Sequence, residues 1–258
     1  MLDAQREACL SAAQAGAEVL VGYFRKLDPA AITEKTKNDY VSNADREAEA
    51  AIRAELASRF PTYGFLGEES GGSGSTEILW IVDPLDGTLN FVQGFPHWCV
   101  SVALWDAAGP LVGCVLDPLR GDCFLAARGQ GATWNGKPMY VSRQPGLDGA
   151  FLATGFAYQL GDRWPLFNAA LGRVFPRAKG LRRAGSAALD LAHVACGIYD
   201  GFFELGLKPW DIAAGALLVL EAGGVLTDWE GRQDWFHSGN LVSGTPGVAP
   251  ELLDALRG

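Results

Sequence analysis

Four acidic side chains stand at the ends of three predicted elements of this chain: Glu68, Asp83, Asp86 and Asp211. Each follows a run of apolar or small residues, which predicts that it lies at the end of a strand or the start of a helix. Two carboxylates about 4 Å apart repel each other by roughly 4 kcal/mol at an effective dielectric constant of about 20. Four carboxylates in one cleft would therefore need a cation, and ligands that are all oxygen suit Mg²⁺ or Mn²⁺.

Asp83 and Asp86 follow a strongly apolar run. Residues 78–82 predict a buried strand whose carboxyl end is at Asp83. Pro84 fixes the backbone at this point and removes one hydrogen-bond donor. The carbonyl of Leu85, between the two carboxylates, is free to act as a further ligand. For this segment alone, a polar turn is the alternative interpretation.

The next two residues, Gly87 and Thr88, present backbone N–H groups that suit an anion. Residues 86–89 also match the end of the Asp-x-Asp-Gly-Thr-Leu signature of haloacid-dehalogenase-like phosphatases. That signature needs its first Asp two positions before the second, where this chain has Pro84. The preceding acid is Asp83 instead, so the spacing excludes that class.

The other signals are weak when taken singly. Glu68 and Glu69 could form a solvated loop pair. Asp211 could be the N-cap of the apolar helix that follows it, and Ser186 could likewise be only a helix cap. Their occurrence together, in this order, is the stronger indication of a site.

Composition limits the classes of partner. A chain of 258 residues can bury a full core, as one large domain or as two closely packed halves. The net charge of −9 argues against a nucleic-acid backbone as the main ligand. Apolar stretches end well before membrane-spanning length, and residues 1–7 carry acids where a signal peptide needs positive charge. We therefore expect a cytoplasmic protein that does not bind a membrane.

The cysteines and histidines do not indicate a metal site. Five Cys, with no Cys-x-x-Cys pair, favour reduced thiols over a disulfide framework or a zinc site. His97, His193 and His237 lack the spacing of metal ligands, so packing or surface placement is the simpler interpretation.

The hydrophobic pattern predicts two halves, at residues 1–146 and 147–258. The first half begins with helices over 3–26 and 45–60, the second of which has capping residues at 42–45 and ends at Pro61. A glycine-rich segment, 71–75, is expected to be a flexible loop. The predicted strands of this half, whose last three form an antiparallel meander, are 63–66, 78–82, 98–105, 111–116 and 122–127.

The second half alternates between strands and helices. Its predicted helices are 163–175, 186–196 and 211–222, followed by a short helix at the C-terminus. Its predicted strands are 150–155, 180–183, 201–205, 225–228 and 240–243. This mixture of predicted helices and strands indicates the α/β (α+β) fold class.

Three ordered motifs in this chain resemble those of the inositol monophosphatase family, particularly its bacterial members. The motifs are residues 67–70, 80–91 and 210–224, and segments 182–192 and 200–204 match in kind. The likeness covers nearly the whole chain. Leu89 is one departure, because the family usually has a second Thr there, but Thr88 is retained.

This resemblance implies a layered αβαβα sandwich of the sugar-phosphatase type, with a metal-centred cleft between its halves. It implies that Mg²⁺, with Mn²⁺ as the alternative, is bound by Glu68, Asp83, Leu85, Asp86 and Asp211. It also implies that Glu68 and Thr88 activate the attacking water, and that Asp39 and Asp45 lie in an outer shell or at a third metal.

The resemblance further implies the substrate contacts and the activity. Phosphate oxygens would bind Gly87 and Thr88, and substrate hydroxyls would contact Glu204, Asp211 and residues Gly185, Ser186 and Ala187. The expected reaction is Mg²⁺-dependent hydrolysis of inositol 1-phosphate or a similar small polyol phosphate, by a homodimer.

Histidinol phosphate, fructose 1,6-bisphosphate and a 3′-phosphonucleotide are alternative substrates. A regulatory protein that binds transcription or ribosome-assembly machinery is the alternative of another class. Arg182 and Arg183 could be a subunit contact or a solvated strand end.

Overall fold

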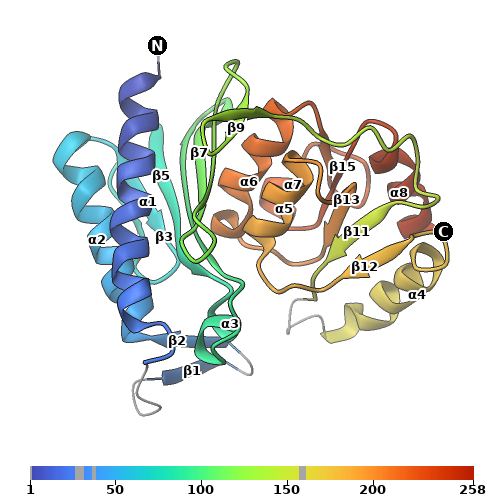
Figure 1. Cartoon of the computed structure of the whole chain (residues 1–258), viewed down its shortest axis with the longest axis horizontal. Coiled ribbons are helices and arrows are strands. Elements are labelled where there is room, and N and C mark those ends of the chain that lie inside the picture. Colours follow the sequence, from blue (N-terminus) through green and yellow to red (C-terminus); the bar gives the residue numbers. More distant parts are fainter. Residues whose placement is uncertain (1, 27–31, 37–38, 157–160) are drawn as a thin grey trace.

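Two long helices cover one face of a large sheet (Figure 1). They are α1 (Asp3–Tyr23) and α2 (Asn43–Arg59). Alanines form much of the buried face of α1, and a Cβ placed on Gly16 would come within 2.7 Å of Ile52 in α2. This close approach explains why small residues recur in α1. The computed structural model describes residues 2–26, 32–36, 39–156 and 161–258, with the backbone alone for 32–36 and 39–42.

The large sheet is mainly antiparallel. Its eight strands in the described residues have the order β10-β9-β8-β7-β6-β5-β3-β4, and only β3 and β5 pair in parallel. The predicted meander is confirmed, since β6, β7 and β8 pair antiparallel in sequence. The strands are β3 (Gly64–Gly67), β4 (Gly71–Ser73), β5 (Ile78–Asp86), β6 (Cys99–Asp106), β7 (Gly109–Asp117), β8 (Asp122–Ala127), β9 (Ala132–Trp134) and β10 (Lys137–Met139).

Two apolar helices, α5 (Ala187–Ala195) and α6 (Pro209–Glu221), lie between this sheet and a second one (Figure 1). Residues 212–219 of α6 are all buried, as expected for a helix enclosed on every side. The second sheet has the order β12-β11-β13-β15-β14. Its strands are β11 (Phe151–Thr154), β12 (Gly180–Arg182), β13 (Gly201–Glu204), β14 (Val225–Thr227) and β15 (Leu241–Gly244).

Helices α4 (Trp164–Val174) and α8 (Val248–Arg257) cover the outer face of the second sheet (Figure 1). The layers therefore follow the order αβαβα, and the predicted sandwich is confirmed. One hydrophobic core includes Phe124 of the first sheet, Leu218 of α6 and Leu241 of the second sheet. The boundary predicted at residue 146 falls between β10 and β11; the division into two halves stays a prediction, because this core joins the sheets.

The short elements are those that the pattern did not predict. Residues 71–73 form the edge strand β4 rather than part of a flexible loop. A hairpin of β1 (Ile32–Thr36) and β2 (Asp39–Ser42), a short 3₁₀ turn at Gly161–Arg163, and helices α3 (Thr88–Val92) and α7 (Trp235–Ser238) were also not predicted. Within the described residues, no helix combines the length and the apolar character needed to cross a membrane.

Candidate active site

A cavity of about 660 Å³ opens between the end of β5, the start of α5, the end of β13 and the start of α6. Every metal or substrate residue that the sequence predicted lines it. These residues are Glu68, Asp83, Leu85, Asp86, Gly87, Thr88, Gly185, Ser186, Ala187, Glu204 and Asp211. The fold thus brings together segments up to 143 positions apart in sequence (68 to 211).

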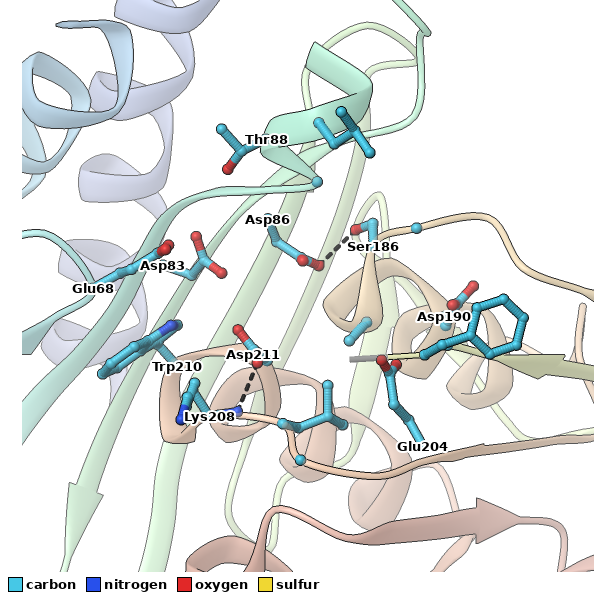
Figure 2. Close-up of a pocket in the computed structure, with 18 of the residues that line it drawn as sticks. Glu68, Asp83, Asp86, Thr88, Ser186, Asp190, Glu204, Lys208, Trp210 and Asp211 are labelled. Carbon is cyan, nitrogen blue, oxygen red and sulfur yellow. Dashed lines mark hydrogen bonds between the residues drawn. The ribbon is translucent and has the colours of Figure 1, made fainter. Parts of the chain in front are cut away.

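An irregularity in β5 lets both of its carboxylates face the cavity (Figure 2). In a regular strand, residues three apart point to opposite faces of the sheet. Here the register with β6 shifts between Asp83, opposite Ser101, and Asp86, opposite Cys99. Such a bulge resets the alternation and re-aims a side chain. Asp83 is also held locally, because its Oδ1 accepts the backbone N–H of Leu85 at 2.9 Å.

Glu68 reaches the same edge because β3 runs parallel to β5. The N–H of Glu68 donates to the Val82 carbonyl at 3.2 Å, which extends the pairing of the two strands beyond the end of β3. The following turn is fixed by the buried Glu49 of α2, a residue that no sequence motif indicated. The carboxylate of Glu49 accepts the N–H groups of Glu69 and Ser70 at 2.8 and 2.9 Å.

Asp86 connects the two parts of the site. Its Oδ2 accepts hydrogen bonds from the Ser186 hydroxyl at 2.6 Å and from the Ala188 N–H at 2.7 Å (Figure 2). Ser186 is the N-cap of α5, as the sequence predicted, and it accepts the Leu189 N–H at 3.4 Å. In this arrangement Ser186 positions Asp86.

Asp211 is not the helix cap that the sequence predicted. Helix α6 begins at Pro209, and Lys208 is the N-cap residue. Asp211 lies in the first turn, where its Oδ2 accepts the Lys208 N–H at 2.7 Å (Figure 2). Proline suits the first position of a helix, where no N–H partner is needed, and this moves the start two residues before Asp211.

Thr88 lies beside a second acidic residue. Its single hydroxyl hydrogen can be donated to the Leu85 carbonyl, at 3.0 Å, or to Asp45 Oδ1, at 3.4 Å. Asp45 is in the first turn of α2 and is 1% exposed. The resemblance implied that Asp45 lies in an outer shell or at a third metal. Asp39, expected there too, is in β2, whose side chains lie outside the described residues.

The carboxylates repel one another in this cavity. Burial raises the pKa of Asp83 well above its ordinary value, and the charges of Glu68, Asp86 and Asp211 raise it further. Burial also raises the pKa of Asp211, followed by the charge of Asp86. For Asp86 burial again raises the pKa, although the hydrogen bonds from Ser186 and Ala188 oppose it. A cation in the cavity would lower the pKa of each of these carboxylates.

Mg²⁺ fits this set of donors. The ligands are oxygens, and a cation would offset the burial and the mutual repulsion that raise their pKa values. Within the described ranges, no three His, Cys, Asp or Glu side chains are gathered closely enough to form a complete cage. Mg²⁺ does not require one, because it keeps several waters and is usually held by one or two carboxylates.

Glu204 is the last residue of β13 and is 8% exposed. A Cβ on Gly155 would lie 2.0 Å from its Oε2, so glycine is needed at 155. Burial raises the pKa of Glu204 to about 8, opposed by Arg183 and assisted by Asp86. Arg183 lines the cavity, rather than being only a solvated strand end.

The raised pKa predicts how stability depends on pH. Between the ordinary value of 4.5 and about 8, the folded chain keeps a proton on Glu204 that the unfolded chain releases, so stability falls as pH rises through this range. In chelated protein, Glu204→Gln should abolish the fall in folding stability that Glu204 causes. This fall is a few kcal/mol, at about 1.4 kcal/mol for each tenfold change in the protonation equilibrium. Denaturant unfolding at pH 5 and pH 8 measures it. An equal pH dependence in both proteins would contradict the buried, protonated state.

Known proteins are similar to this chain over nearly its whole length. Residues 2–257 match the model of the inositol monophosphatase family. The protein named Nus factor SuhB of Escherichia coli K12 is 41% identical over 248 residues, which cover 95% of this chain and 93% of that protein. Its namesake in Pseudomonas aeruginosa is 42% identical over 258 residues, covering 96% and 94%.

Solved structures of similar proteins have the same fold. The extragenic suppressor protein suhB from Bartonella henselae superposes with a TM-score of 0.92 at 39% identity, covering 97% of each chain. The inositol monophosphatase from Anabaena superposes with a TM-score of 0.88 at 36% identity, covering 99% of this chain and 96% of that one.

Proposed function

The chain belongs to the inositol monophosphatase family, and from this premise we propose that it is a Mg²⁺-dependent phosphomonoesterase of small polyol phosphates, with inositol 1-phosphate as the first candidate substrate. One observation carries the proposal: carboxylate and carbonyl oxygens just after β3, in β5 and in α6 line the same cavity as the glycine turn that begins α3. The family supports phosphatase chemistry in general. The metal and the substrate are the parts that we propose.

Glu68, Asp83, Asp86, Asp211 and the Leu85 carbonyl are the residues that would hold Mg²⁺. When bound, Mg²⁺ lowers the pKa of a water and stabilises negative charge on phosphate and leaving-group oxygens. The protein's part is to fix the positions of the carboxylates. Asp86 is fixed by Ser186 and Ala188, and Asp211 by the Lys208 N–H.

Thr88 and Asp45 are placed to move a proton. The resemblance implied Glu68 as the partner of Thr88. The described hydrogen bonds of the Thr88 hydroxyl go instead to Leu85 and Asp45, which supports a role for Asp45. We propose that a water beside Thr88 passes its proton to this hydroxyl as the hydroxyl proton moves to Asp45, while Glu68 orients the water. A positioned acid–base group of this kind contributes about 10²- to 10⁴-fold to a rate.

The turn at Gly87 is suited to the phosphate. Gly87 has φ 98°, in the left-handed region, and a Cβ there would lie 3.1 Å from the His97 carbonyl. This conformation lets α3 begin at Thr88, at the edge of the cavity. We propose that the N–H groups of Gly87 and Thr88 bind phosphate oxygens, and that Glu204 and the backbone of Gly185 to Ala187 contact the alcohol part.

A panel of phosphomonoesters tests the substrate. In Mg²⁺, the release of phosphate from inositol 1-phosphate should exceed the release from histidinol phosphate, fructose 1,6-bisphosphate and a 3′-phosphonucleotide in kcat/KM. Each of these three is an alternative substrate of the same chemistry. A higher kcat/KM for any of them would move the assignment to that compound. No release from any phosphomonoester would remove the proposed activity.

The relatives named Nus factor SuhB support a second candidate function, a regulatory contact with transcription machinery. The net charge of −9 favours a protein partner over nucleic acid. A pull-down from cell extract with wild type and with Asp83→Asn separates the two functions. Transcription proteins retained equally by both would support a role that does not need catalysis, and their absence from both would oppose it.

The quaternary state follows from the resemblance and the location from the sequence pattern, and both are proposals. We propose a homodimer in the cytoplasm. Light scattering after size-exclusion chromatography would test the dimer, and cell fractionation would test the location. A monomer at micromolar concentration would contradict the first proposal.

A further inference from the structure

Asp190 is a buried carboxyl group that the proposed reaction does not use. It lies in the first turn of α5, is 1% exposed and lines the cavity. Its Oδ1 is enclosed and accepts no hydrogen bond from the described residues. A buried polar atom without a partner costs about 1 to 3 kcal/mol, so this position calls for an explanation.

Other buried aspartates show what a structural role looks like in this fold. Asp200 accepts the Phe151 N–H at 2.7 Å and the Ser142 hydroxyl. Asp228 accepts the N–H groups of Glu230 and Arg232. An acid in the first turn of a helix is favoured by the helix dipole, but the dipole does not require burial beside a cavity. Asp190 therefore differs from the structural aspartates.

Asp190 has Glu204 as a neighbour on a different element. Figure 2 shows both on the side of the cavity away from Glu68 and Asp83. Burial raises the pKa of Asp190, the charge of an ionised Glu204 raises it further, and Arg183 opposes this. One wall of the cavity thus carries two carboxyl groups and a nearby guanidinium.

We propose that Asp190 is a further specificity-determining residue, which together with Glu204 forms a subsite that binds two hydroxyl groups of a polyol phosphate. The inference rests on the proposed function and deepens it. Two acceptors on α5 and β13 match two donors on one substrate, whereas a single alcohol could engage only one of them. Arg183 disfavours a second cation here, so the subsite suits neutral hydroxyls rather than an ammonium group.

Asp190→Leu is the direct test. Leucine is close in size and favours a helix, but it cannot accept a hydrogen bond. We expect kcat/KM for inositol 1-phosphate to fall about tenfold, mainly through KM, because a substrate hydroxyl loses its buried hydrogen-bond partner. Phenyl phosphate, which has no hydroxyl, should stay within about twofold. Asp190→Asn, which keeps one acceptor oxygen, should retain part of the kcat/KM that Asp190→Leu loses.

The controls separate this role from a structural one. Asp254→Asn makes a similar change on the exposed end of α8 and should alter neither substrate. The melting temperature of Asp190→Leu should equal or exceed that of wild type, because an unpartnered buried acceptor is removed. Equal losses on both substrates, or no loss on either, would overturn the subsite.

Wild-type kinetics distinguish the two proposals. A chain that hydrolyses phenyl phosphate with no preference for inositol 1-phosphate would overturn the subsite and leave the phosphatase activity standing. A preference for the amine of histidinol phosphate that is lost in Asp190→Leu would also overturn it, in favour of a cation subsite. A chain that hydrolyses neither compound would remove the proposed function and the subsite with it.

Discussion

Asp83→Asn is expected to lower kcat/KM for a phosphomonoester by about 10³-fold or more. Asp83 is buried among carboxylates, and we propose that it is a ligand of the cation that stabilises the transition state. Metal ions contribute several kcal/mol of such stabilisation, and roughly 4 kcal/mol corresponds to about 10³-fold in rate. Mg²⁺ affinity should fall as well, which calorimetric titration of the chelated protein measures.

The same variant should fold normally. Asparagine keeps the Oδ1 that accepts the Leu85 N–H, and it removes one of several mutually repelling charges. The melting temperature in EDTA is therefore expected to be equal to or higher than that of wild type. Asp254→Asn serves as the matched control and should retain full activity. Near-normal kinetics for Asp83→Asn would remove Asp83 from the site.

Thr88→Val should lower kcat by about 10²- to 10⁴-fold, the range for a positioned proton-transfer group. Valine has nearly the shape of threonine but no hydroxyl, so the path from water to Asp45 is interrupted. Mg²⁺ affinity should change little, because the Thr88 side chain is not one of the proposed metal ligands. Single-turnover phosphate release at saturating Mg²⁺ isolates the chemical step from binding.

Thr88→Ser is the matched control, since it restores the hydroxyl that donates to Leu85 and Asp45. It should recover most of the activity. Asp45→Asn should resemble Thr88→Val in rate if Asp45 takes the proton. A Thr88→Val protein with the kcat of wild type would exclude the hydroxyl from catalysis, and an active Asp45→Asn protein would exclude Asp45 as the acceptor.

The long elements could be predicted because their periodicity is strong. Helix α2 and strands β5 to β8 begin and end within a few residues of the ranges expected from the sequence. Strand β4 could not be predicted, because glycines give no alternation and its pairing with β3 depends on tertiary structure. Proline at 209 was the available signal for the true start of α6.

The candidate site could be predicted only where residues lie in a motif. The carboxylates at 83 and 86 follow an apolar strand, but the bulge that turns both toward one cavity depends on pairing with β6. Glu49 lies in no motif and looks like part of a charged surface, and Asp190 looks like an ordinary acid in a helix although its segment, 182–192, resembles the family. Their importance appears only from burial and from the partners that they have or lack.

We propose above all that the carboxylate cavity acts through Mg²⁺ to hydrolyse a phosphomonoester. Phosphate release from inositol 1-phosphate by exhaustively chelated protein, titrated with Mg²⁺, tests this most directly. We predict no release in EDTA and a saturable return of activity as Mg²⁺ is added. Full activity in the chelated protein would contradict the claim.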